Sequence, residues 1–241
     1  MREYACGFYR RREPFGEGEV QGALRALNEL PMRFFPMSMW VSKDQKIGLS
    51  GPDALRREHV PAEYDISPGQ AHIPLDCANG AELVFTESNQ PTLVLASAVI
   101  TFTDQVLRES RWTLQDLAAL MRGVVPVFQP DVAELWDHAH RGRSSYQERM
   151  FDFDWRRIPL GLYWLNYYSR DWVANIGERR LRELSKHVPL AEWLPDGGVL
   201  IGIQEEPYDE SNPVHRERQL FLEQKVFDLP GLQALFPNPG L

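Results

Sequence analysis

Hydrophobic and polar residues first alternate and then change period at the start of the chain. The alternation over residues 4–11 predicts a β-strand, because successive side chains of a strand point to opposite faces. Over 20–30 the apolar residues recur at spacings of three and four, which predicts an amphipathic helix ended by Pro31. Residues 32–41, rich in Phe, Met and Trp, are the next predicted strand. The chain is thus expected to open as strand, helix, strand.

Proline and glycine then interrupt the pattern. Eight of them lie between 43 and 80, so we expect this stretch to be irregular, with at most a short helix near 54–57. Better strand patterns follow over 81–85 and 92–102, the second of which is long and β-branched near its end.

Two capping patterns predict helices in the middle of the chain. Thr113 precedes an apolar helical pattern and has Asp116 three residues on. Asp131 has Glu134 at the same spacing and precedes apolar residues that recur as far as Ala139. Both arrangements are typical of helix N-termini, so we expect helices to start after Thr113 and after Asp131.

The last third mixes strands and helices. The residues predict a strand pair over 151–155 and 160–168, a helix capped by Ser169 and ended by Gly177, and a buried strand over 199–203. Asn212-Pro213 is an N-cap followed by a proline at the first helical position, which predicts a helix through about Lys225.

Strands and helices follow one another without a regular βαβα order. This favours an α+β fold with a mainly antiparallel sheet flanked by helices. A length of 241 residues suits one large domain or two small ones. We expect one compact domain spanning 1–241, with two fused sub-domains as the alternative, since each half contains a strand–helix–strand run.

Composition indicates an ordinary globular protein of the cytoplasm. The chain is 43% hydrophobic and 25% charged, and no stretch approaches the roughly 18 uninterrupted apolar residues that a membrane span needs. The opening residues have no apolar core of a secretory signal. The two cysteines, Cys6 and Cys77, have no metal-binding spacing and are expected to be buried free thiols.

The negative charge is concentrated toward the C-terminus. Of the formal net charge of -8, residues 190–241 carry -6 and residues 1–189 carry -2. An acidic surface repels a phosphate backbone, which argues against direct nucleic-acid binding. It attracts a basic protein, mainly by accelerating the encounter.

Three sets of residues have the side-chain types that catalysis or metal binding requires. His138 and His140 could chelate one metal ion only if the helix has already ended, because residues two apart on a helix point in different directions. The pair Asp152 and Asp154 is more typical of the solvated face of a strand. The third set is His72, Asp76 and Cys77, which nothing in the sequence brings together. No phosphate-binding loop or hydrolase elbow is present, so we expect neither enzyme activity nor a cofactor.

Two segments carry the residues expected of a protein interface. The run 204–210 is the densest acidic stretch and lies between a predicted strand and a predicted helix, where it forms either a solvated loop or a docking loop; its candidate partner-binding residues are Glu205, Glu206, Asp209 and Glu210. The strand 160–168 is rich in aromatic residues. One row of these belongs in the core, while exposed members of the other would be interface anchors; the candidates are Trp164, Tyr167 and Tyr168.

Several sequence blocks resemble a known family. They are 7–13 with the helix over 20–30 and the segment 34–43, the block 161–177 with Trp-Leu-Asn-Tyr-Tyr at 164–168, and 194–202 with the acidic run and the final helices. Together they resemble the immunity protein 52 family of bacterial toxin–immunity pairs, including those of type VI secretion. Residues 43–160 match this family only loosely.

The resemblance implies a non-catalytic α+β protein that binds and neutralises a cognate toxin in bacterial competition. Toxins paired with this family are often nucleases of the restriction-endonuclease fold, and a basic nuclease suits the acidic C-terminal region. The family supplies no catalytic residues. Two other functions stay open: a metal-dependent hydrolase that uses His138 and His140 with Asp137 or Asp152, and an adaptor component of a secretion system.

Overall fold

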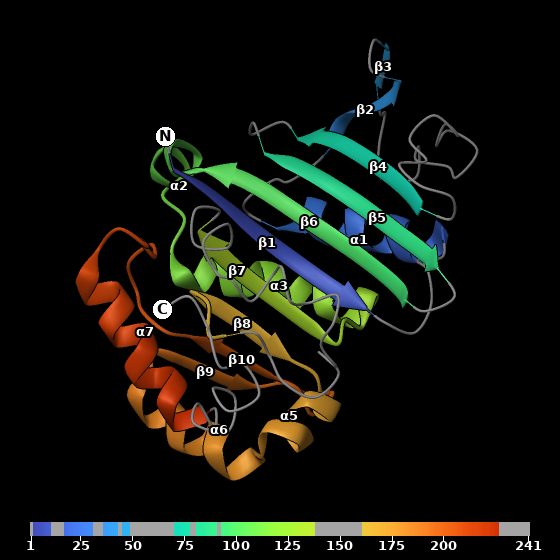
Figure 1. Cartoon of the computed structure of the whole chain (residues 1–241). Coiled ribbons are helices and arrows are strands. Elements are labelled where there is room, and N and C mark those ends of the chain that lie inside the picture. The colour runs from blue at the N-terminus through green and yellow to red at the C-terminus, as the bar shows by residue number, and fades with distance from the viewer. Residues whose placement is uncertain are drawn as a thin grey trace. The chain divides into compact units, whose positions relative to one another are not determined.

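The computed structural model describes residues 2–10, 17–30, 36–42, 45–48, 70–77, 81–90, 93–137 and 161–226. Contacts group these residues into two compact units, one spanning Glu3–Ala133 and the other Glu134–Leu241 together with Arg2. Both units combine helices with antiparallel strand pairs (Figure 1). The predicted α+β fold with a mainly antiparallel sheet is therefore confirmed.

The first unit is built on a sheet with the strand order β3-β2-β4-β5-β6-β1. Its strands are β1 (Glu3–Arg10), β2 (Pro36–Ser42), β3 (Gln45–Gly48), β4 (Gln70–Cys77), β5 (Glu82–Gln90) and β6 (Leu93–Thr103). Its helices are α1 (Glu17–Glu29), α2 (Asp104–Ser110) and α3 (Leu114–Phe128). The longest pairings join β6 to β5 and to β1, with Cys6 opposite Ile100 in the register.

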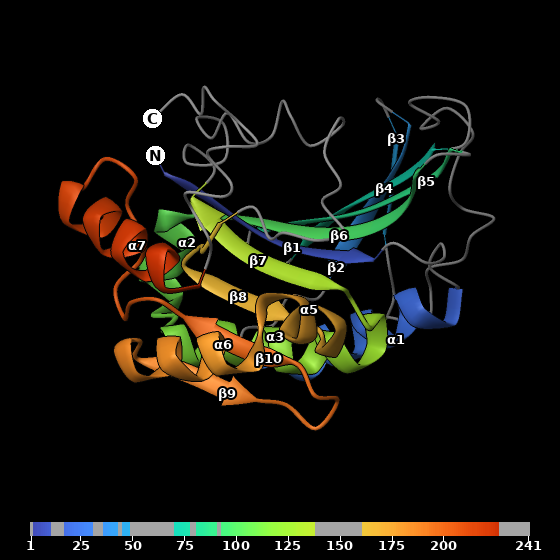
Figure 2. The ribbon, with the colours of Figure 1, turned by 60° about the horizontal axis from the view of Figure 1, so that its bottom comes forward.

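Helices α1 and α3 lie side by side on the sheet of the first unit (Figures 1 and 2). Phe128, at the end of α3, contacts the ring of Phe8 on β1 and the ring of Phe85 on β5. Arg10 on β1 donates two hydrogen bonds to the carboxylate of Glu19 on α1, at 2.5 and 2.9 Å. Aromatic packing and one bidentate ion pair therefore hold the helices against the strands.

The sequence predicts most elements of this unit. Helix α3 begins as expected, because the Thr113 hydroxyl accepts from the backbone N–H of Asp116 while the Asp116 carboxylate accepts from that of Thr113. The expectation of irregular structure over 43–80 was wrong at β3 and β4, where backbone pairing with β2 and β5 outweighs the interruptions by proline and glycine. The short helix expected at 54–57 lies outside the described residues.

Strand β7 (Val132–Asp137) lies where the two units meet in sequence, and it corrects one prediction. Asp131 and Glu134 mimic a capping box, yet the segment is extended. All six residues of β7 are buried, including Glu134 and Asp137. Burial on both faces favours a strand here over the helix that the local spacing predicts.

The second unit has the strand order β7-β8-β10-β9. Its further strands are β8 (Leu165–Tyr168), β9 (Leu190–Trp193) and β10 (Val199–Gly202). Its helices are α5 (Arg170–Ile176), α6 (Glu178–Leu184), the short 3₁₀ turn η4 (Ser185–His187) and α7 (Pro213–Val226). Helix α6 packs against α5 and α7.

The predicted helices after Ser169 and Asn212 and the predicted strand near 199–203 are confirmed. Asn212 caps α7 by accepting a hydrogen bond from the backbone N–H of Val214 at 3.0 Å. Ser169 holds the N-cap position of α5 but makes no side-chain cap bond. Helix α6 and strand β9 were not predicted from the sequence, and the strand expected at 151–155 lies outside the described residues.

Both cysteines are buried free thiols, as predicted. Burial raises the pKa of the Cys6 thiol well above its ordinary value, so this sulfur stays protonated and unreactive near neutral pH. Among the described helices, none is long and apolar enough to cross a membrane.

Candidate partner-binding surface

The aromatic residues of β8 and the segment before it lie in the core of the second unit. Trp164, Tyr167 and Tyr168 are 1%, 2% and 0% exposed. Their polar atoms bond inside the protein: the Trp164 indole donates to the Gln204 carbonyl at 3.1 Å, and the Tyr168 hydroxyl donates to the Gly161 carbonyl at 3.2 Å. The prediction that these three residues anchor a partner is therefore wrong, because no apolar ring surface reaches solvent.

Tyr167 is fixed by the turn that joins β9 to β10. Its hydroxyl donates to one carboxylate oxygen of Asp196 at 2.8 Å, and the other oxygen of Asp196 accepts from the backbone N–H of Gly198 at 2.8 Å. A Cβ at Gly198 would come within 2.5 Å of the Tyr167 ring. The ring therefore packs directly on the backbone, which explains why the turn ends in glycine.

Asn166, on the same strand β8, is also buried. Its side-chain amide donates to the carbonyls of Tyr163 and Ile201 at 2.8 and 3.2 Å, and its oxygen accepts from the backbone N–H of Tyr163 at 2.9 Å. A buried amide with these partners fixes the pairing of β8 with β10. The sequence block 164–168 is thus a structural motif.

The acidic loop, residues 204–210, joins β10 to α7 and has an exposed tip. Glu205, Glu206 and Pro207 are exposed, whereas Gln204 is only 4% exposed. The Gln204 side-chain amide donates to the Glu206 carbonyl at 3.0 Å, and the Gln204 carbonyl accepts from Trp164. The buried tryptophan and glutamine therefore hold the start of the loop, so that two carboxylates point to solvent on a supported backbone.

Tyr208 anchors the middle of the acidic loop. It is 1% exposed, and its hydroxyl lies 2.5 Å from Oε1 of Gln219 and 3.0 Å from Oε2 of Glu210. Burial, followed by the charge of Glu210, raises the pKa of the Tyr208 hydroxyl, which stays protonated and able to donate. Glu210 is itself buried. Its predicted role as a docking charge is wrong, because it is part of the loop's internal network.

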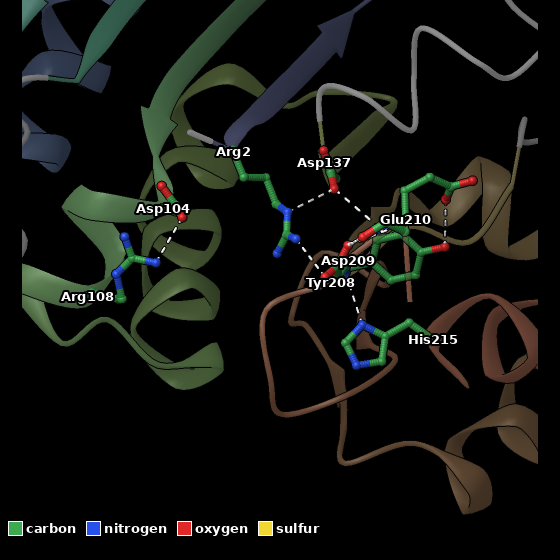
Figure 3. A network of polar contacts seen from close by, with 9 residues as sticks. Arg2, Asp104, Arg108, Asp137, Tyr208, Asp209, Glu210 and His215 are labelled. Atoms are coloured by element: carbon green, nitrogen blue, oxygen red, sulfur yellow. Dashed lines mark hydrogen bonds and ion pairs between the residues drawn. The ribbon is translucent and has the colours of Figure 1, made fainter. Parts of the chain in front are cut away.

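Arg2 links the C-terminal end of the acidic loop, at Asp209, to strand β7 (Figure 3). Its guanidinium lies 2.6 Å from Oδ2 of Asp209 and 3.5 Å from Oδ2 of Asp137. The same Asp137 oxygen accepts from the backbone N–H of Glu210 at 3.3 Å. Partial burial alone would raise the pKa of Asp209, but hydrogen bonds from Ser211 and the charge of Arg2 lower it below its ordinary value. Asp209 is therefore a charged, internally bonded and partly exposed group, and its role in docking stays a prediction.

Glu223 on α7 is hydrogen-bonded to Gln219, which in turn contacts the Tyr208 hydroxyl. Its Oε1 accepts from the side-chain amide of Gln219 at 3.0 Å and from the backbone N–H of Leu162 at 2.9 Å. Burial raises the pKa of the Glu223 carboxyl to about 7, even though both hydrogen bonds favour its charged form. Tyr208, Gln219 and Glu223 thus connect the acidic loop to the interior through one chain of hydrogen bonds.

The candidate catalytic residues do not assemble in the part of the chain that the structure describes. Asp137 is 2% exposed and is ion-paired with Arg2. His138, His140, Asp152 and Asp154 lie outside the described residues. Within the described ranges, no three His, Cys, Asp or Glu side chains come together as a metal site would require. Cys77 ends strand β4, where a loop was expected, and is buried.

Sequence reasoning missed the residues that hold the loop in place. Arg2 bonds to residues more than 130 positions away, and no local pattern marks it. Tyr208 carried a weak signal, since an aromatic residue inside an acidic run has a reason to be buried. The exposed candidates that remain are Glu205 and Glu206.

Comparison with known proteins defines the fold and leaves the family open. No protein-family model matches the chain, and no curated protein matches it. Among solved structures it is similar to the type VI secretion system (T6SS) protein PA0821 of Pseudomonas aeruginosa, with a TM-score of 0.59 and 11% sequence identity. This similarity covers 94% of this chain and 76% of that chain. At such low identity it shows a shared fold alone, and the resemblance to the immunity protein 52 family rests only on the sequence motifs.

Proposed function

We propose that this protein is an immunity protein that binds and neutralises a cognate secreted toxin with a basic surface. Its partner, by the resemblance to the immunity protein 52 family, is a nuclease of the restriction-endonuclease fold delivered by type VI secretion. The protein acts in the cytoplasm as an inhibitor, without a catalytic step or a cofactor. The partner is a protein, and neither nucleic acid nor a membrane is bound directly.

The observation that carries the proposal is the construction of the acidic loop. Glu205 and Glu206 are exposed on a backbone held by Trp164, Gln204 and Tyr208. Two exposed carboxylates on a supported backbone favour a basic partner, because little backbone entropy is lost when the loop binds. Neither carboxylate makes an ion pair with another described residue.

The fold supports the same proposal from another direction. The solved structure to which the chain is similar is named as a T6SS protein, so the architecture occurs in that secretion system. An immunity protein in T6SS competition has to bind a toxin protein, and the acidic loop favours such a partner when its surface is basic. The shared fold is a property of the backbone, whereas the attraction to a basic partner comes from side-chain charge, so each supports the proposal independently.

The test is co-expression with the toxin encoded beside this protein's gene, followed by pull-down and a growth assay. The proposal predicts growth rescue and a stable complex. A double charge reversal, Glu205→Lys with Glu206→Lys, should weaken the complex. Glu82→Lys with Glu109→Lys provides the control, because both residues are exposed and the net charge changes equally. Absence of both binding and rescue with the unaltered protein would refute the immunity function.

A further inference from the structure

The outward face of α7 exposes an apolar stripe. Val214 and Phe221 are 66% and 51% exposed, and Leu220 is 39% exposed. The opposite face of this helix is buried through Gln219, Leu222 and Val226. Since large apolar side chains gather on one side of a single helix, the stripe is a candidate contact surface.

The charges along the stripe are arranged symmetrically about Phe221. Glu217 lies four residues before it and Lys225 four residues after it, so the three side chains form one ridge of the helix. Among the described residues, Glu217 makes no ion pair and Lys225 is not bonded to a carboxylate. The Lys225 ammonium lies instead 4.5 Å from the centre of the Phe221 ring. Among the described residues, an acid and a base without an opposite charge thus lie four positions before and four positions after an exposed ring.

This face is held in place by its surroundings. The ring of His187, at the end of η4, meets the Phe221 ring edge to face, with centroids 6.1 Å apart. Arg218 donates to the Ile203 carbonyl at 2.7 Å and to the His187 carbonyl at 3.1 Å. Contacts on both sides therefore keep Phe221 and its helix in a defined orientation.

We propose that α7 pairs antiparallel with α7 of a second copy of this chain, about a two-fold axis at Phe221. In such a pair each residue faces the one equally far beyond Phe221 in the other copy. Phe221 then packs against Phe221, and Glu217 of each copy meets Lys225 of the other. One face thereby matches itself in charge about a central ring, as a two-fold symmetric interface requires.

The size of the surface limits the strength of this dimer. Charged pairs lie about 6 Å along the helix on either side of the central ring, so the contact is only about two helical turns long and buries a small area. That is less than the roughly 800 Å² per partner of a standard stable interface. We therefore expect a dimer that forms reversibly as concentration rises. This inference is independent of toxin binding, because it uses α7 and not Glu205 or Glu206.

Charge exchange tests the proposal with the full-length protein. Sedimentation equilibrium is measured up to about 1 mM, where even weak association is detectable. The unaltered protein should dimerise, and Glu217→Lys and Lys225→Glu should each weaken self-association at least about tenfold, because two repulsive pairs replace two attractive ones. Glu109→Lys, an exposed reversal in the other unit, should leave it unchanged.

Mixing the Glu217→Lys variant with the Lys225→Glu variant provides the decisive experiment. In a mixed dimer the lysine introduced at position 217 of one copy would face the glutamate introduced at position 225 of the other. The unaltered Lys225 and Glu217 would face each other as well, so both attractive pairs return. We expect association in the mixture that neither variant shows alone.

Three results would overturn the antiparallel pairing. One is an unaltered protein that stays monomeric, and another is a mixture that fails to associate. The third is dimerisation that persists in both single variants, since the contact would then lie elsewhere.

Discussion

The aromatic strand β8 and the acidic loop after β10 both have the composition of a binding surface, yet they have opposite roles. Trp164, Tyr167 and Tyr168 are buried, and each has a polar atom bonded inside the second unit. In the acidic loop, Glu205 and Glu206 are exposed, whereas Glu210 is buried. The aromatic residues therefore support the binding surface from inside, and the carboxylates of Glu205 and Glu206 form it.

The difference follows from how each group is satisfied. An indole or a phenol needs only one hydrogen bond to be buried at little cost, and β8 lies among backbone carbonyls that accept it. A carboxylate is far more costly to bury without a partner. Glu210 enters the interior only where Tyr208 donates to it and Arg216 lies nearby at 3.5 Å. Glu205 and Glu206 have no such partners among the described residues and stay in water.

The largest effect is expected in the aromatic strand. Trp164→Ala removes a buried ring and the hydrogen bond to Gln204, which should lower the free energy of unfolding by about 3–5 kcal/mol. Urea denaturation measures this loss. The milder Trp164→Phe keeps most of the packing and should cost less. A loss below about 1 kcal/mol for the alanine variant would contradict the structural role of β8.

Glu223→Gln should change the pH dependence of stability. The folded protein keeps the Glu223 proton up to about pH 7, while the unfolded chain releases it near its ordinary value of 4.5. The unfolding free energy should therefore fall by roughly 2–3 kcal/mol as pH rises between these values. The glutamine variant keeps the acceptor oxygen and should lack this fall. Parallel pH profiles for the two proteins, from denaturation at pH 5, 6, 7 and 8, would contradict the prediction.

Arg2→Gln should loosen the C-terminal end of the acidic loop, at Asp209 and Glu210. It removes the ion pair between Arg2 and the buried Asp137 carboxylate, at an expected cost of about 1–2 kcal/mol, since Arg2 is partly exposed. Hydrogen exchange should accelerate at the amides of Glu210 and Ser211, whose acceptors are Asp137 and Asp209. Arg108→Gln is the control, because its pair with Asp104 lies within α2. Equal exchange at Glu210 in both variants would contradict the role of Arg2 in holding the loop against Asp137.

Among the substitutions of internally bonded residues, Tyr167→Phe should have the smallest effect on stability. It removes one hydroxyl that donates to Asp196 and leaves the ring packed on Gly198. The expected loss is about 1 kcal/mol, the net contribution of one hydrogen bond. Thermal denaturation measures it, with the Tyr168→Phe variant as a comparison in the same strand. An unchanged melting temperature would mean that Asp196 does not depend on Tyr167.

Local signals account for what the sequence predicted correctly. The capping box at Thr113 and the Asn-Pro start of α7 are short-range chemistry, and both helices begin there. The same kind of signal failed at Asp131, because burial of the whole segment favours strand β7. The inward turn of Asp209 and Glu210 depends on Arg2 and Asp137, which are distant in the chain. No local pattern contains that information.

The most direct test of the central claim is the rate at which this protein associates with its toxin at low salt. Glu205→Lys with Glu206→Lys should slow association at least about tenfold, with a difference that shrinks as salt is added. Stability should change by less than about 0.5 kcal/mol, because both side chains are exposed. The control Glu82→Lys with Glu109→Lys should associate at nearly the normal rate. Equal rates for the two double variants would contradict the account, because net charge alone would then explain the encounter.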